Sequence, residues 1–151
     1  MTEINRRRFL TTATASAAVL ASRNIGRAAS ASDTVVLAIM GANNRGSQLA
    51  TGFAQQTGAE IAYICDCDER AIKTGIDAAT SHGGRKPQGI KDFRKALDDP
   101  AVDALVCAAP NHWHAPATIL ACLAGKHVYV EKPASQTPDE GERMIAAGRS
   151  A

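Results

Sequence analysis

The chain alternates short apolar segments with segments of helical periodicity, and this alternation most constrains how it can fold. Residues 34–40 are continuously apolar and rich in β-branched side chains, which is typical of a parallel strand buried on both faces. Residues 59–65, 102–109 and 127–130 are three further strand-like runs. Strands that alternate with helices pair in parallel through right-handed crossovers, with helices on both faces of the sheet. The sequence therefore predicts an α/β fold with a doubly wound parallel sheet.

The segments between the strand-like runs are expected to form helices and loops. The expected helices cover residues 47–56, 69–80, 92–97, 115–124 and 138–147. Gly125 suits the left-handed position that follows a helix, and Thr137 suits the N-cap of the last helix. Residues 81–89 contain three glycines and a proline, so we expect a loop there.

The first 31 residues have the features of an export signal. Two adjacent arginines, Arg6 and Arg7, precede a weakly apolar stretch over residues 10–21, and the small residues 29–31 fit a signal peptidase site. The paired arginines indicate the twin-arginine route, with its translocation machinery as partner and a periplasmic or other extracytoplasmic location. A membrane anchor is the alternative, but a span needs roughly twenty apolar residues and this stretch is far shorter.

Charge excludes nucleic acid as a partner of the remaining chain. The sequence contains 17 Lys and Arg against 15 Asp and Glu, and residues 1–31 hold five of the basic residues and one acid. Residues 32–151 therefore carry twelve basic and fourteen acidic side chains. A weakly negative domain lacks the basic footprint of a nucleic-acid-binding protein.

The four cysteines are expected to be buried free thiols. Cys65, Cys67 and Cys107 lie in or beside strand-like runs, and Cys122 lies in a helical pattern. Free cysteine packs in such places as a small apolar residue. Disulfides are the alternative in an exported protein, but twin-arginine export moves folded proteins and would preserve reduced thiols. The spacing of Cys65 and Cys67 does not match the usual zinc or redox motifs.

A glycine-containing turn follows the first strand-like run. Residues 41–46 keep the first and third glycines of the dinucleotide-binding pattern G-x-G-x-x-G, and Asn43 takes the second position. Asparagine tolerates positive φ better than most residues, so the turn can survive there. Such a turn binds the pyrophosphate of a dinucleotide at a helix N-terminus. Taken alone, the motif is explained equally well by a plain tight turn, and Arg45 either faces phosphates or is simply exposed.

An acidic residue at the end of the second run strengthens the dinucleotide prediction. Asp66 lies twenty residues after Gly46, where an acid accepts hydrogen bonds from the adenosine ribose 2′-OH and disfavours a 2′-phosphate. Asp68 competes for this role, and either acid suits the N-cap of the following helix. Asp66 favours NAD, whereas Arg45 and Arg70 keep NADP open.

Two further runs end in polar motifs where ligands bind parallel sheets. The first ends in Asn111-His112-Trp113-His114, and the second, after an alanine-rich helix and residues 125–128, ends in Glu131-Lys132-Pro133. These motifs resemble the N-terminal NAD(P)-binding Rossmann domain of Gfo/Idh/MocA-type oxidoreductases, such as glucose–fructose oxidoreductase and inositol dehydrogenase. The chain is most similar to exported members with twin-arginine leaders, over about residues 35–147.

The resemblance implies roles for the residues of both motifs. Lys132 would lie near the nicotinamide and the substrate hydroxyl, where an ammonium stabilises charge that develops on oxygen. The alternative for Lys132 is a strand-end lysine without a chemical role. Glu131 would position this lysine or pair with it, and Pro133 matches a turn-forming, sometimes cis, proline. Pro110 and Asn111 match the loop beneath the cofactor, where Asn111 can bond the nicotinamide ribose.

The histidines of the first motif also invite a metal interpretation. No Cys, Asp or Glu lies at a suitable spacing from His112 and His114 to complete a site, so we expect no metal. Trp113 is expected to pack, against the protein or against cofactor or substrate. The candidate catalytic residue is Lys132, and the candidate cofactor-binding residues are Gly41, Asn43, Asn44, Arg45, Gly46, Asp66, Pro110, Asn111, His114, Glu131 and Lys132.

The predicted function is that of an NAD(P)-dependent oxidoreductase that acts by hydride transfer on a sugar, polyol or derivative. The cofactor is expected to be NAD, with NADP also compatible. One alternative is an NAD-dependent glycosidase of the same fold, and another is a non-catalytic nucleotide-binding fragment. The resemblance implies a second α/β substrate domain, so residues 32–151 are expected to be a Rossmann domain truncated before it. A homo-oligomer is compatible with the full-length form.

Overall fold

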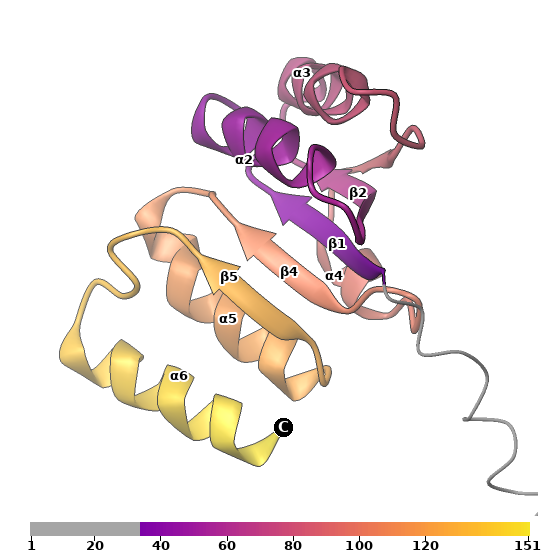
Figure 1. Ribbon diagram of the computed structural model, residues 1–151. Helices are drawn as coiled ribbons and strands as arrows, with labels where there is room; N and C mark the ends of the chain where they lie inside the picture. The colour runs from indigo at the N-terminus through magenta and orange to yellow at the C-terminus, as the bar shows by residue number, and fades with distance from the viewer. Residues whose placement is uncertain (1–33) are drawn as a thin grey trace, which may run out of the picture. The chain divides into compact units, whose positions relative to one another are not determined.

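A parallel sheet of five strands organises the part of the chain that the computed structural model describes, residues 34–151. The predicted signal peptide over residues 1–31 lies outside the described residues. The strands are β1 (Val35–Met40), β2 (Ala59–Cys65), β3 (Gln88–Ile90), β4 (Ala104–Cys107) and β5 (His127–Val130). Their order is β3-β2-β1-β4-β5, and every pairing is parallel. This arrangement confirms the predicted Rossmann-type sheet (Figure 1).

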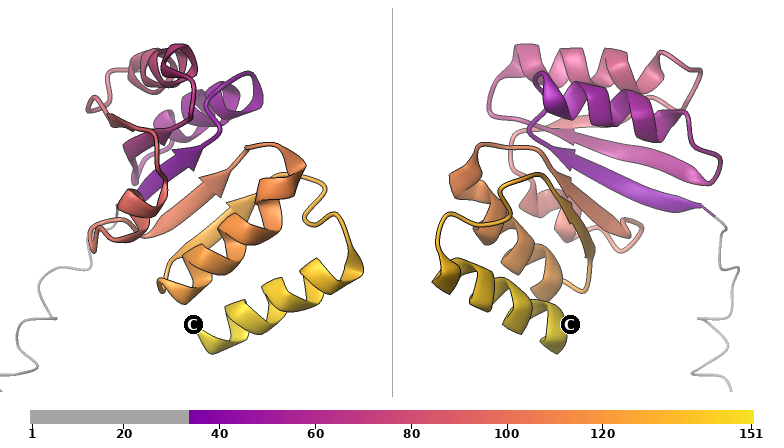
Figure 2. Two further views of the ribbon diagram at one scale, coloured as in Figure 1. Left: turned by 180° about the vertical axis from the view of Figure 1, so that it is seen from behind. Right: turned by 60° about the vertical axis from the view of Figure 1, so that its left-hand side comes forward.

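Helices cover both faces of the sheet (Figures 1 and 2). The helices are α2 (Arg45–Ala54), α3 (Glu69–Thr80), α4 (Arg94–Leu97), α5 (His114–Leu123) and α6 (Pro138–Ser150), with a 3-10 turn η2 (Asn111–Trp113) before α5. One face is covered by α2 and α3, and the other by α4 and α5. Helix α6 packs against α5. Within residues 34–151, no helix is both long and apolar enough to span a bilayer.

The central strand β1 contributes alternate side chains to two hydrophobic clusters. Leu37 and Ile39 pack beneath α2 and α3, whereas Ala38 and Met40 pack beneath α4 and α5. Successive side chains of a strand point to opposite faces, so a strand buried on both faces must be apolar throughout. Ile39 is fully buried at 0% exposure. The continuous apolar run recognised in the sequence therefore follows from the double covering of the sheet.

Several local signals proved accurate, and one strand was missed. Asp68 accepts a hydrogen bond from the backbone N–H of Arg70 at 2.9 Å and caps α3. Thr137 caps α6, and Gly125 has a φ of 71°. The predicted loop over residues 81–89 is wrong at its end, because Gln88 and Gly89 pair with β2. A three-residue strand is too short to show periodicity, so only its neighbour in the sheet defines it.

The cysteine prediction is confirmed in part. All four thiols are free, Cys65 and Cys107 are buried, and Cys122 is partly buried. Burial raises the pKa of the Cys65 thiol to about 12, so this thiol is protonated and unreactive at neutral pH. Cys67 is exposed. The expected burial is wrong there because β2 ends at Cys65 and the chain has left the sheet.

The packing of α3 against β2 depends on a helical glycine. A Cβ atom added at Gly75 would lie 2.7 Å from Cγ2 of Ile64 and 2.9 Å from Cβ of Ala42. We expect Gly75→Ala to lower the free energy of unfolding by about 1–3 kcal/mol, because overpacking outweighs the gain in helix propensity. The measurement is urea denaturation followed by circular dichroism.

Gly52 in α2 provides the matched control, since nothing lies within 4 Å of a Cβ added there. We expect Gly52→Ala to raise the free energy of unfolding by roughly 0.5–1 kcal/mol, through helix propensity alone. Equal stabilisation by both substitutions would show that α3 does not press on β2 as described.

Candidate cofactor-binding site

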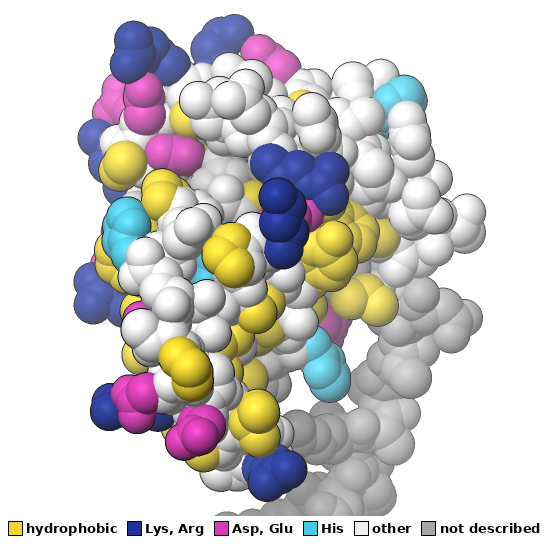
Figure 3. Space-filling model, turned by 90° about the vertical axis from the view of Figure 1, so that its left-hand side faces the viewer, with side chains coloured by type: hydrophobic (Ala, Val, Ile, Leu, Met, Phe, Trp, Pro, Cys, Tyr) yellow, Lys and Arg dark blue, Asp and Glu magenta, His cyan; other side chains and the backbone are white. Residues whose placement is uncertain are grey.

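The predicted site residues follow the carboxyl ends of β1, β2, β4 and β5, which meet along one edge of the sheet. Strand β2 pairs with one side of β1, and β4, which comes later in the chain, pairs with the other side of β1. Such a switch in strand order opens a crevice where doubly wound sheets bind ligands. Figure 3 views this edge, where Lys and Arg side chains gather near the middle, with acidic and hydrophobic side chains around them.

The turn after β1 approaches the loop after β4 too closely for side chains. Gly41 has a φ of 84°, and a Cβ atom added there would lie 2.5 Å from the backbone nitrogen of Ala109. A Cβ atom added at Gly46 would overlap the carbonyl oxygen of Gly41. Both glycines of the motif are therefore required by packing, which leaves backbone on the crevice side of the turn.

The two asparagines of the turn have distinct conformations. Asn44, not Asn43, has the positive φ, at 37°. The side chain Oδ1 of Asn43 accepts a hydrogen bond from the Asn44 N–H at 2.9 Å, and its carbonyl oxygen accepts one from the Gly46 N–H at 2.9 Å. The tolerance for positive φ that we expected of Asn43 is thus used one residue later.

The N-terminus of α2 has no side-chain cap from residues 34–151, unlike α3 and α6. The first N–H groups of an α-helix have no partner within the helix and carry the positive end of its dipole. An uncapped N-terminus directly after a glycine turn is the arrangement that binds phosphate groups.

Asp66 and Asp68 have separate structural roles, which the sequence alone left open. Oδ2 of Asp66 accepts the N–H of Ala42 at 2.9 Å, and its Oδ1 accepts the N–H of Asp68 at 3.0 Å. Asp66 therefore fastens the end of β2 to the glycine turn. Each carboxylate oxygen has a further lone pair, so Asp66 can still accept a ribose hydroxyl. Asp68 forms an ion pair with Arg70 at 2.8 Å. This pair balances the charge of Arg70, which is one of the two cations that kept NADP open as a cofactor.

An ion pair joins the glycine turn to the loop after β5. Nε of Arg45 lies 2.7 Å from Oε1 of Glu131, whose side chain is only 15% exposed. The hydrogen bond and the attraction between the two charges lower the pKa of Glu131 and raise the pKa of Arg45. We expected Glu131 to position or pair with Lys132. The side chain of Glu131 forms an ion pair with Arg45, and the backbone N–H and the charge of Lys132 also help to lower the pKa of Glu131.

Lys132 is exposed beside this ion pair, and the Lys132–Pro133 peptide bond is cis. Its ammonium forms no hydrogen bond or ion pair with the residues from Thr34 to Ala151. Because Arg45 engages the adjacent carboxylate of Glu131, the Lys132 cation remains available to an incoming oxygen.

His114 joins two loops of the site. Its ring is 2% exposed, with Nδ1 lying 2.6 Å from the carbonyl oxygen of Pro133 and Nε2 lying 2.8 Å from that of Ala109. Both ring nitrogens thus face protein oxygens, which gives His114 a structural role in place of the cofactor contact that we expected. The ring holds the loop that carries Lys132 against the loop after β4.

A cavity of about 440 Å³ lies against the same edge of the sheet, within the size range of small-molecule sites. The predicted residues Gly41, Asp66 and Pro110 line it, whereas Asn111 is exposed at the start of η2. Sequence reasoning missed most of its wall, because no local signal shows which side chains of separate elements meet at the edge of the sheet. The missed lining residues are Met40, Cys65, Cys67, Lys91, Asp92, Phe93, Arg94, Ala109 and Leu120. Among residues 34–151, no cluster of three His, Cys, Asp or Glu residues is placed to hold a metal.

The sequence profile of an oxidoreductase family with an NAD-binding Rossmann fold, the Gfo/Idh/MocA family, matches residues 35–151. The chain belongs to this family. Two curated relatives are named glycosyl hydrolase family 109 proteins. The one from Shewanella pealeana is 30% identical over 95% of this chain and 36% of its own length, and the one from Saccharopolyspora erythraea is 36% identical over 77% and 26%.

A solved structure extends the comparison of the Gfo/Idh/MocA domain. The WlbA dehydrogenase from Bordetella pertussis, in complex with NADH and UDP-GlcNAcA, is 28% identical with a TM-score of 0.66. The alignment covers 78% of this chain and 34% of that protein. The chain thus spans about a third of the length of the proteins that it resembles.

The described residues of the Gfo/Idh/MocA domain fit NAD. The glycine turn packs directly against the backbone of Ala109, and the N-terminus of α2 beside it has no side-chain cap. Asp66 lies beside the turn at the carboxyl edge of the sheet, and it also lines the cavity. A phosphate site, a ribose acceptor and a cavity in this order match the sequence of groups in a dinucleotide.

Proposed function

We propose that this chain is the cofactor-binding part of an oxidoreductase that transfers hydride between NAD and a hydroxyl-bearing carbon of a sugar, polyol or derivative. The observation that carries the proposal is the placement of an unpaired Lys132 on the same sheet edge as the glycine turn and Asp66. The WlbA dehydrogenase, which was solved with NADH and a nucleotide sugar, supports this substrate class.

Each site residue would then have a defined task. The N–H groups at the start of α2 would bind the pyrophosphate, with Arg45 as the nearest cation. Asp66 would accept the adenosine ribose hydroxyls, and Asn111 would bond the nicotinamide ribose. His114 and Glu131 would hold the loop that presents Lys132.

Lys132 would act on the substrate oxygen. Bound NAD would supply a hydride acceptor: the carbon would lose a hydride to it, the hydroxyl proton would pass to solvent, and a carbonyl would form. The Lys132 ammonium would hydrogen-bond the oxygen and stabilise its developing negative charge. An unpaired cation suits this role because no protein carboxylate has to be displaced first.

The names of the curated relatives favour a second candidate, an NAD-dependent glycosidase. In that reaction the sugar is oxidised transiently, the glycosidic substituent is eliminated, and the product is reduced again after water adds. NAD is regenerated, so the net reaction is hydrolysis. Release of nitrophenol from a nitrophenyl glycoside by the complete enzyme, without a net change in nicotinamide absorbance, would favour this candidate over the dehydrogenase.

Titration with NAD and NADP tests the proposed cofactor. We expect the chain to bind NAD more tightly than NADP, because Asp66 repels a 2′-phosphate and Asp68 already pairs with Arg70. Asp66→Ala should weaken NAD binding and narrow the preference over NADP. Isothermal titration calorimetry provides both affinities, and circular dichroism checks the fold. A folded chain that binds neither nucleotide would contradict the proposal.

Lys132→Met tests the catalytic role in the complete enzyme. Methionine keeps an unbranched side chain of similar length but removes the charge. We expect kcat to fall at least about a hundredfold, or about 2.7 kcal/mol, because stabilisation of the developing charge on the substrate oxygen is lost. NAD affinity should change little. Near-normal turnover would mean that Lys132 is only an exposed strand-end residue.

We further propose that residues 1–31 direct export by the twin-arginine pathway, on the strength of Arg6 and Arg7 and the short apolar stretch after them. Replacing both arginines by lysine should stop the protein reaching the periplasm of a bacterial host. Cell fractionation with an antibody provides the measurement. Unchanged export of the double variant would exclude the pathway.

A further inference from the structure

The cavity lies at the end of the sheet edge that is remote from Lys132. The strand order is β3-β2-β1-β4-β5, and Lys132 follows β5. The cavity extends from the loop after β4 across the ends of β1 and β2 to the turn after β3, and Asp66 is part of its lining. A dinucleotide whose nicotinamide lies near Lys132 and whose pyrophosphate lies at the glycine turn must place its adenosine end here.

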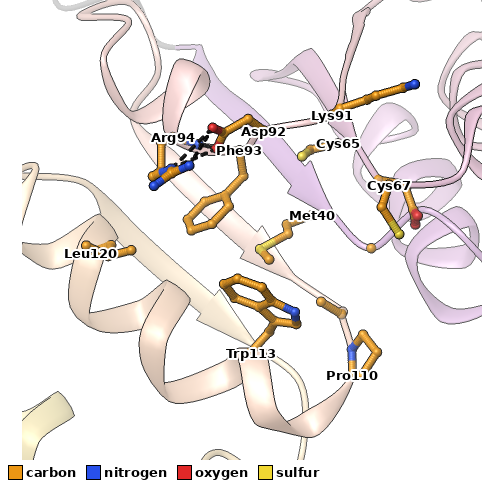
Figure 4. A pocket seen from close by; sticks show the side chains of 13 residues that line it. Met40, Cys65, Cys67, Lys91, Asp92, Phe93, Arg94, Pro110, Trp113 and Leu120 are labelled. Atoms are coloured by element: carbon orange, nitrogen blue, oxygen red, sulfur yellow. Dashed lines mark hydrogen bonds and ion pairs between the residues drawn. The ribbon is translucent and has the colours of Figure 1, made fainter.

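One part of the wall of this cavity is aromatic and apolar. Trp113, Phe93 and Met40 converge on the same space, and Leu120 lies across from them (Figure 4). The ring centroids of Phe93 and Trp113 are 6.1 Å apart, with an interplanar angle of 76°. In this edge-to-face arrangement, one ring supports the other without covering both of its faces.

Trp113 is only partly buried for so large an apolar side chain. It is 41% exposed, whereas Phe93 behind it is 6% exposed. Its backbone is held in η2, where its N–H donates to the carbonyl oxygen of Pro110 at 2.8 Å. Trp113 thus presents ring surface on a fixed backbone, which lowers the ordering cost of stacking a planar ligand.

We propose that the adenine ring of NAD stacks on Trp113 in this cavity, with Phe93 supporting the indole from behind. This inference rests on the proposed cofactor. It assigns to Trp113 the anchoring of the adenosine end, whereas the hydrogen bonds of Asp66 orient the ribose. Stacking on an aromatic side chain accepts any planar base, so adenine selectivity would come from the polar residues at the rim.

Trp113 is the single tryptophan of the chain, so its fluorescence reports on this cavity alone. The 151-residue chain is titrated with NAD, with ADP-ribose, which lacks nicotinamide, and with nicotinamide mononucleotide, which lacks adenine. Calorimetry measures binding of the same ligands in parallel. We expect NAD and ADP-ribose to quench Trp113 fluorescence, and nicotinamide mononucleotide to leave it unchanged.

Three variants separate stacking from simple packing. Trp113→Leu should weaken NAD and ADP-ribose binding by about fivefold to a hundredfold, because it removes the aromatic face. Trp113→Phe should restore most of that affinity. Leu123→Ala is the control, because Leu123 is an exposed apolar residue of α5 outside the cavity. This variant should bind NAD and ADP-ribose with the affinity of the parent chain.

The outcomes distinguish this inference from the proposed function. If calorimetry detects no NAD binding to the folded parent chain, the proposed cofactor is wrong and the stacking falls with it. If NAD binds but fluorescence is unchanged, or Trp113→Leu binds within twofold of the parent, stacking on Trp113 is overturned while the function stands. Should Trp113→Leu fail to fold, the fluorescence titration of the parent and the Trp113→Phe affinity still decide the question.

Discussion

The close approach of the glycine turn to the loop after β4 is the constraint on which the rest of the site depends. A Cβ atom at Gly41 would lie 2.5 Å from the Ala109 backbone nitrogen. On the opposite side of the turn, the carboxylate of Asp66, at the end of β2, accepts a hydrogen bond from the N–H of Ala42. The turn is thus clamped between two neighbouring strand ends, which pre-organises it and points the N-terminus of α2 at the crevice.

A second set of contacts fixes the end of the crevice near β5. Arg45 reaches Glu131 across the edge of the sheet, and the two ring nitrogens of His114 lie within hydrogen-bond distance of the carbonyl oxygens of Ala109 and Pro133. Together they hold the loop of Lys132 without using its ammonium. The crevice therefore has an unpaired cation at one end and a carboxylate, Asp66, with an apolar cavity at the other. This asymmetry gives a dinucleotide one favoured direction.

Features within a few residues of one another were predictable from the sequence. The cap at Thr137 and the left-handed Gly125 were found correctly, because these signals act within one helical turn, whereas the sequence left open whether Asp66 or Asp68 caps α3. Strand β3 was missed for the opposite reason, since its three residues become a strand only through pairing with β2. A helix was expected over residues 92–97, but no local signal showed that Phe93 would line a cavity.

The sequence by itself determined the sheet, its double covering and the edge on which the motifs gather. Continuous apolar runs can only be satisfied by burial on both faces, and parallel strands bring their carboxyl ends together. Only the tertiary structure decided the partners of individual side chains. Glu131 forms its ion pair with Arg45, 86 positions away, while its neighbour Lys132 contributes a weaker attraction. Charge pairing depends on distance in space, and the parallel sheet brings the turn after β1 within reach of the loop after β5.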